Sequence, residues 1–173
     1  MSFTQLAAKF TAPYIACTAV GVGLTGYFYY GNLALKYQGL LPYTDSRIQP
    51  TYPQRLDAWA WTYGMGKKHM GLSITIGTLV YTTAAILTPM VKLRLPLLIA
   101  AGLSASNAVW TLSLMQPINN RLSELAEKSK VDPLVPSTEV DDLIARWKRL
   151  HNVRLVLGAS AYFTGVAVLL LSM

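Results

Sequence analysis

Four long apolar stretches dominate the sequence, over residues 14–35, 64–87, 95–115 and 151–172. At a rise of about 1.5 Å per residue, each is long enough as a helix to cross a hydrocarbon core of about 30 Å. Charged residues make up only 13% of the chain, whereas about 25% is typical of a soluble domain. The sequence therefore predicts an all-α integral membrane protein, with residues 1–173 forming a single four-helix bundle.

Two long connections join these helices on one face of the bundle, because four spans place both termini on the opposite face. The first, Lys36–Tyr63, is predicted to be a polar loop whose aromatic residues lie at the membrane interface or cover a flat ligand. Val91–Arg94 is predicted to be a very short turn. The second long connection is partly helical: a new or kinked helix begins at Pro117, and Thr138 with Asp141 resembles a capping box that opens the last helix.

Basic residues predict the orientation in the membrane. The face with the termini carries Lys9, Lys92 and Arg94. The loop face carries many more, namely Lys36, Arg47, Arg55, Lys67, Lys68, Arg121, Lys128, Lys130, Arg146, Lys148 and Arg149. By the positive-inside rule the long loops are cytosolic, and we expect an endomembrane location, in the endoplasmic reticulum or a vesicle.

Composition also excludes several classes of function. The basic residues behind the net charge of +7 are interspersed with acids, so nucleic-acid binding is not expected. The single cysteine, Cys17, cannot form an internal disulfide. No carboxylate lies in the four spans, which argues against a proton relay. It also argues against a zinc or iron site, since such a metal takes three or four protein ligands.

An ionisable pair, His151 and Arg154, lies where the last apolar stretch begins. Trp147, His151, Arg154 and Gly158 are separated by steps of three or four, so they lie on one face of a helix. A cationic side chain at the bilayer centre costs about 2.5–3.5 kcal/mol on insertion scales and usually marks a functional site. This pair is therefore the first candidate for such a site.

Other polar side chains are predicted to converge on the same region. The second and last spans begin at the loop face, and the first and third spans end there. This topology gathers Tyr29, Asn32, His69, Asn107, Trp110, Asn119 and His151 near one end of the bundle. We expect a pocket between the helices at that end. Two histidines on different helices also leave open a pair of axial haem ligands.

The second half of the chain resembles the anthrone oxygenase family, small four-helix membrane proteins of aromatic polyketide pathways. The resemblance rests on Trp110, on the Pro-x-Asn-x-x-Leu pattern of Pro117–Leu122, and on the Trp-x-x-x-His-x-x-Arg pattern of Trp147–Arg154. The first half is similar only in span order and around Trp59–Gly64. The resemblance implies oxidation of an anthrone to an anthraquinone with O2 as co-substrate, without a flavin, haem or metal.

The residues suit that chemistry, in which loss of an acidic C–H proton gives a carbanion that itself reduces O2. His151 is the predicted base, since imidazole transfers protons near neutral pH. Arg154 is predicted to hold the oxyanion, with a hydrogen bond from Asn119 or Asn120. A planar aromatic substrate is predicted to be bound by Trp110, Asn120, Trp147, His69, Asn107 and Tyr29.

Two other interpretations stay open from the sequence. A non-enzymatic membrane binding or scaffold protein would use the polar cluster only to fix helix register. It would fill the space around His151 with side chains, whereas an enzyme needs a cavity there. A haem- or metal-binding redox protein is the third interpretation. Small residues along the first and last spans also allow a homo-oligomer.

Overall fold

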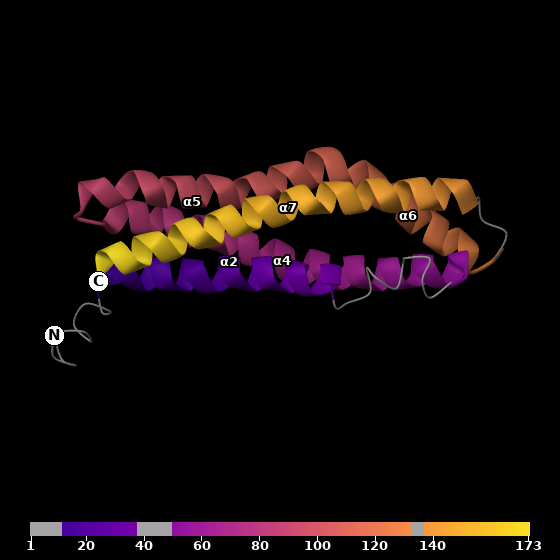
Figure 1. Cartoon of the computed structure of the whole chain (residues 1–173), viewed down its shortest axis with the longest axis horizontal. Coiled ribbons are helices and arrows are strands. Elements are labelled where there is room, and N and C mark those ends of the chain that lie inside the picture. The colour runs from indigo at the N-terminus through magenta and orange to yellow at the C-terminus, as the bar shows by residue number, and fades with distance from the viewer. Residues whose placement is uncertain (1–11, 38–49, 133–136) are drawn as a thin grey trace.

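The computed structural model describes residues 12–37, 50–132 and 137–173, and these are helical almost throughout (Figure 1). The helices are α2 (Pro13–Tyr37), α4 (Tyr52–Leu87), α5 (Val91–Trp110), the π-helical segment η2 (Thr111–Met115), α6 (Gln116–Ser129) and α7 (Ser137–Ser172). No strand occurs in these three ranges. The all-α prediction is therefore confirmed for the described residues.

The long helices lie side by side, with the α4–α5 turn and the C-terminus at the same end (Figure 1). α2 and α5 each pack against both α4 and α7. In the described part of the chain, Tyr52–Leu87, Val91–Ser129 and Ser137–Ser172 are long and apolar enough to cross a membrane. These stretches contain three of the four predicted spans. The first predicted span lies within α2, which is rich in glycine, threonine and tyrosine, and its crossing stays a prediction.

The loop prediction for Lys36–Tyr63 is wrong from Tyr52 onward, because α4 begins there. Pro53 lies in the first turn, where a helix tolerates the missing N–H. Leu56 and Trp59 follow at helical spacing and are buried in a core cluster with residues of α6 and α7. Tertiary packing thus gives this polar stretch a buried helical face. The prediction also fails for Lys36 and Tyr37, which end α2, whereas Pro50 and Thr51 are not helical. Residues 38–49 of the predicted loop lie outside the described residues.

The predicted turn at Val91–Arg94 is also wrong, because these residues form the first turn of α5. Leu93 and Leu97 lie one turn apart on its buried face, which holds this segment in the helix. The turn between α4 and α5 is Thr88–Met90 instead.

The capping box predicted at the start of the last helix does not form as expected. Thr138 lies inside α7, one residue after its start. The carboxylate of Asp141 instead accepts hydrogen bonds from the Tyr52 hydroxyl, at 3.1 Å, and from Arg55, at 2.6 Å. Asp141 therefore ties the start of α7 to the start of α4.

The new or kinked helix predicted to begin at Pro117 corresponds to α6, which begins at Gln116 after the π-helical turn of η2. Pro117 has no N–H for the carbonyl of Ser113, and in a regular α-helix its ring would clash with that carbonyl. The wider turn of η2 relieves this conflict. The chain therefore stays helical from α5 into α6.

One ion pair joins α6 to α7 outside the predicted spans, and others lie within α6. Arg121 contacts Glu139 at 2.6 Å and Glu124 at 2.8 Å, and Lys128 contacts Glu124 at 2.7 Å. Hydrogen bonds from Lys128 and Arg121 lower the pKa of Glu124 to about 2. The hydrogen bond from Arg121 also lowers the pKa of Glu139. All of these side chains are substantially exposed, so each pair contributes little by itself.

Two of the buried clusters lie at opposite ends of α4. One joins the start of α4 to α6 and to the first half of α7, and the other lies where α4 turns into α5. In the second cluster, Tyr81 packs over Gly21 and Gly165, where a Cβ atom would overlap its ring or hydroxyl. The Tyr81 hydroxyl also hydrogen-bonds with Thr25 at 3.1 Å. Small residues of α2 and α7 thus admit one large side chain from α4.

Candidate functional site

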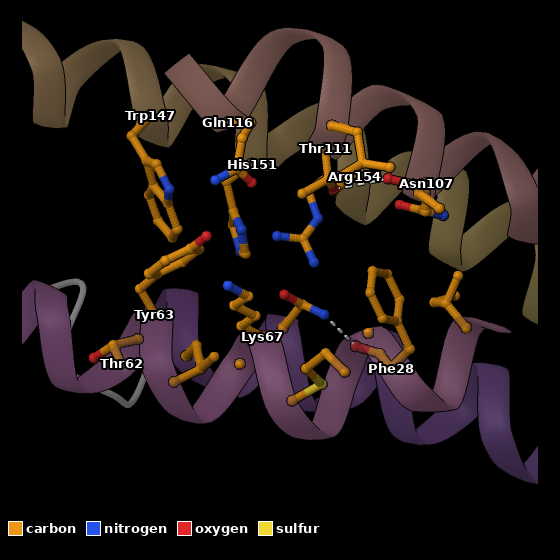
Figure 2. Close-up of a pocket in the computed structure, with 18 of the residues that line it drawn as sticks. Phe28, Thr62, Tyr63, Lys67, Asn107, Thr111, Gln116, Trp147, His151 and Arg154 are labelled. Carbon is orange, nitrogen blue, oxygen red and sulfur yellow. Dashed lines mark hydrogen bonds between the residues drawn. The ribbon is translucent and has the colours of Figure 1, made fainter. Parts of the chain in front are cut away.

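A cavity of about 270 Å³ lies between these two clusters, where α2, α4, η2 and α7 meet (Figure 2). Its apolar lining includes Phe28, Leu35, Met70, Ile74, Leu112 and Trp147, and its polar lining includes Asn32, Thr62, Tyr63, Lys67, Asn107, Thr111, Gln116, His151 and Arg154. A dry cavity of about 150 Å³ holds benzene, and sites for drug-sized ligands begin at about 300 Å³. The cavity is therefore large enough for a ligand of more than one ring.

His151 lies on the inner face of α7 and is 2% exposed. Its ring is stacked on that of Trp147, with centroids 4.9 Å apart and an interplanar angle of 13°. Both ring nitrogens are buried without a hydrogen-bond partner of good geometry, although the backbone of Asn32 lies near the ring. The imidazole is thus held in place by stacking and keeps both nitrogens available to a ligand.

A second contact fixes the position of Trp147. Its indole N–H donates a hydrogen bond to the Oδ1 of Asn119 at 2.9 Å. Asn119 belongs to α6 and is 1% exposed. Asn119 therefore lies behind the cavity wall and orients His151 through the tryptophan.

Arg154 extends from α7 into the same space, and Figure 2 shows its guanidinium directed into the cavity. The Cζ atom lies 5.3 Å from the centre of the Phe28 ring, within range of a cation–π contact. Its Nε is buried without a partner, and no carboxylate of the described residues lies within salt-bridge distance. Gly158 makes room for Phe28, since a Cβ there would lie 2.8 Å from its Cδ1. The cation is thus placed on an aromatic surface and left without a counter-ion.

The opposite wall belongs to α4. Tyr63 and Lys67 are one turn apart, and both side chains reach toward the His151 side of the cavity in Figure 2. The Tyr63 ring is stacked on Trp59, with centroids 5.1 Å apart and an angle of 11°. None of the described lining residues is an acid. The site therefore combines cations and neutral donors with aromatic walls, which suits a planar ligand that carries or develops negative charge.

Asn107 supplies an acceptor from α5. Its Oδ1 is buried without a partner, while its Nδ2 donates to the Leu103 carbonyl at 3.4 Å. The neighbouring Thr111 hydroxyl is already used, because it donates to the Asn107 carbonyl at 2.7 Å. The free amide oxygen of Asn107 is therefore available to a hydroxyl of a ligand.

The structure brings together part of the predicted set. His151, Arg154, Trp147 and Asn107 line the cavity, and Asn119 lies directly behind Trp147. The remaining predicted residues lie elsewhere: Trp110 donates to the Leu150 carbonyl, Asn120 is exposed and accepts from Gln116, Tyr29 stacks with Tyr162, and His69 lines a separate groove between α2 and α4.

Sequence reasoning missed Phe28, Tyr63 and Lys67. Tyr63 was missed because the segment that ends there was predicted to be a loop. Lys67 lies in the second predicted span, where His69 was chosen instead. A signal was present, since Trp59, Tyr63, Lys67 and Met70 recur at steps of three or four. Read as a helix, that stripe would have placed Lys67 rather than His69 on the inner face.

The described residues contain no group of three or more His, Cys, Asp or Glu side chains that could hold a metal ion. His69 and His151 do not meet in the cavity, since His69 does not line it.

The sequence profile of the anthrone oxygenase family matches residues 59–164. No curated protein and no solved structure matches the chain. The matched segment includes the cavity wall from α4 and the Trp147, His151 and Arg154 stripe, so it covers most of the site. The chain therefore belongs to the anthrone oxygenase family.

Proposed function

We propose that this protein oxidises an anthrone-type aromatic to the corresponding anthraquinone with O2. The observation that carries the proposal is the cavity itself, which joins a buried, unpartnered imidazole to an unpaired guanidinium between aromatic walls. A scaffold that used these residues only for helix register would fill this space. In the balanced reaction the methylene carbon loses two hydrogens and gains one oxygen atom, and the second oxygen atom of O2 leaves as water.

His151 acts as the base in the first step. One of its ring nitrogens removes a proton from the methylene carbon of the bound anthrone, and the electron pair passes into the ring system and onto the carbonyl oxygen. Neither ring nitrogen has a hydrogen-bond partner of good geometry, and the stacking on Trp147 holds the ring in one plane. Such positioned proton transfer typically accelerates a step by about 10²–10⁴-fold.

Arg154 stabilises the oxyanion that this step creates. A cation in a site with no acidic lining residue interacts strongly with developing negative charge, because little water screens it. Tyr63 is placed to donate a further hydrogen bond, and the free Oδ1 of Asn107 is placed to accept one from a ligand hydroxyl. Asn119, predicted as a direct donor, instead positions Trp147.

The carbanion then transfers electrons to O2, and a C–O bond forms to give a hydroperoxide at the former methylene carbon. The protonated His151 returns its proton to the peroxide oxygen. Loss of the remaining C–H proton and cleavage of the O–O bond give the second carbonyl group and release water. The enzyme-bound base therefore ends the cycle in its starting protonation state.

The test is quinone formation by the purified protein from a simple anthrone, in air and under nitrogen. We expect O2-dependent turnover above spontaneous oxidation, and a loss of about 10²-fold or more in His151→Ala. Asn152→Ala is the matched control, because Asn152 is exposed on the same helix. Equal turnover with and without protein would overturn the function. Turnover that survives in His151→Ala would keep the function and reject this base.

We further propose that α2 forms the fourth span and that the long loops face the cytosol in an endomembrane. The excess of basic residues at the loop end supports this orientation. A cysteine introduced at Lys130 in a Cys17→Ser background should react with a membrane-impermeant maleimide from the cytosolic side of sealed vesicles. Reaction only from the lumenal side would reverse the orientation.

A further inference from the structure

Several cations at the loop end are paired with carboxylates, whereas the two cations that line the cavity are not. At the loop end, Arg55, Arg121, Lys128 and Lys130 each lie 2.8 Å or less from a carboxylate. At the cavity, Arg154 and Lys67 have no acid within salt-bridge distance among the described residues, and no acid is found in the described lining. The cavity is therefore a cationic region whose counter-charge is missing from the described protein.

The two cavity cations come from opposite walls. Arg154 belongs to α7, and Lys67 belongs to α4 on the other side of the space in Figure 2. Lys67 is exposed along its length but reaches the cavity with its amine, so it lies at the mouth. Gly66 and Gly71 also line the cavity, and a Cβ at either would meet nothing within 4 Å. Space is therefore open around the lysine.

The proposed reaction develops one oxyanion, and Arg154 beside His151 is placed to meet it. A second cation on the opposite wall has no task in that step. Because an unpaired charge near a low-dielectric cavity is unfavourable, a ligand that brings a second negative charge would bind more tightly.

We propose that Lys67 forms an anion subsite for the substrate. The substrate then carries a second anionic oxygen group, a carboxylate or an ionised phenol, on an outer ring. This inference rests on the proposed function for the orientation of the substrate, but not for its test, which measures binding.

The test uses quinones that cannot react further, with protein in nanodiscs of neutral lipid. Quenching of tryptophan fluorescence reports binding, since Trp147 lines the cavity. The probes are an anthraquinone with an outer-ring carboxylate, its neutral methyl analogue, and an outer-ring hydroxyanthraquinone measured below and above the pKa of its phenol. We expect the anionic probe to bind about tenfold more tightly than the neutral one.

Lys67→Met should abolish this preference and Lys67→Arg should retain it. Lys68→Met is the matched control, because Lys68 is exposed beside Lys67 and does not line the cavity. A preference for the carboxylate identifies that group, and tightening only on phenol ionisation identifies the phenolate. Equal binding of all probes, or an equal loss in Lys68→Met, would overturn the subsite and leave the function standing. No binding of any quinone would count against the function itself.

Discussion

At two levels of the bundle, glycines make room for a large aromatic side chain, but one level is filled and the other contains a cavity. At one level Tyr81 fills the space between α2 and α7, because Gly21 and Gly165 leave room for its ring. At the other level Phe28 packs over Gly158 in the same manner, yet a cavity remains beside it. The filled level offers one satisfied hydroxyl, whereas the open level gathers unpartnered polar atoms of Asn107, His151 and Arg154.

The same helices therefore form one level that stabilises the bundle and another that is open to a ligand. Buried polar groups without partners are costly and rare in native proteins. Four of the seven such side-chain atoms in the described residues line the cavity, which indicates that this level is arranged for a ligand rather than for packing. Substitutions at the two levels should therefore affect different measurements.

The largest effect is expected at the open level. Arg154→Met removes the cation that we propose meets the oxyanion and should lower kcat by about 10²–10³-fold, as loss of an oxyanion-hole donor typically does. Thermal unfolding in detergent should change little, because the guanidinium has no ion-pair partner among the described residues. Arg149→Met, on the exposed side of α7, is the control. Unchanged kcat with a lowered unfolding temperature would assign Arg154 to structure.

Substitutions at the filled level should change the stability of the protein. A Cβ at Gly165 overlaps the Tyr81 hydroxyl, and overpacking of this kind typically costs about 1–3 kcal/mol. Gly165→Ala should therefore lower the unfolding temperature, while the specific activity of the folded fraction stays near that of the parent. The control is Gly102→Ala, since a Cβ at Gly102 meets nothing within 4 Å. Equal unfolding temperatures for the two variants would contradict the tight fit of Tyr81.

Gly158→Ala sharpens the comparison. Its Cβ would lie 2.8 Å from Phe28, but here the ring can shift into the cavity. We expect a smaller loss of unfolding temperature than in Gly165→Ala, together with a several-fold rise in KM as the cavity shrinks. Steady-state kinetics and thermal unfolding on the same preparation distinguish the two effects. A stability loss as large as that of Gly165→Ala, with unchanged KM, would mean that the Phe28 ring does not shift into the cavity.

The smallest effect concerns the ion pairs of the loop end. The pKa of Glu124 is lowered to about 2 from an ordinary value near 4.5, and that of Glu139 is also lowered. Because the folded pKa values are depressed, this stabilisation is present at neutral pH. It is lost as the pH falls from about 4.5 toward 2. The unfolding temperature should fall modestly over that range, since these groups are exposed.

Arg121→Gln should flatten that acid response, because Arg121 pairs with both carboxylates. Melting curves between pH 7 and pH 3 measure the difference. An acid response of the same size in Arg121→Gln and the parent would show that other carboxylates carry it.

Sequence patterns were sufficient where a property is local. Apolar length located the three helices that can cross a membrane, Pro117 located the break, and the spacing of Trp147, His151 and Arg154 placed them on one helix face. Sequence patterns failed to predict secondary structure where tertiary packing overrides local composition. Leu56 and Trp59 hold a polar stretch in a helix only through contacts with α6 and α7, and this error concealed Tyr63.

Contacts between residues far apart in the sequence could not be predicted from local patterns. The hydrogen bond from Trp147 to Asn119 spans 28 positions of the chain, and nothing in either neighbourhood specifies the partner. Asn119 was therefore predicted to touch the ligand, whereas the structure places it one layer behind the cavity.

The packing of α6 depends on the number of residues in the π-helical turn of Thr111–Met115. Each residue of an α-helix turns the following residues by about 100°, so the wide turn sets the rotational phase of α6 relative to α5. Inserting a further residue within Thr111–Met115 would change that phase by about 100° and turn Ile118, Asn119 and Leu122 away from α4 and α7. The number of residues in this turn thus fixes how the cavity wall is oriented relative to the buried cluster of α4, α6 and α7.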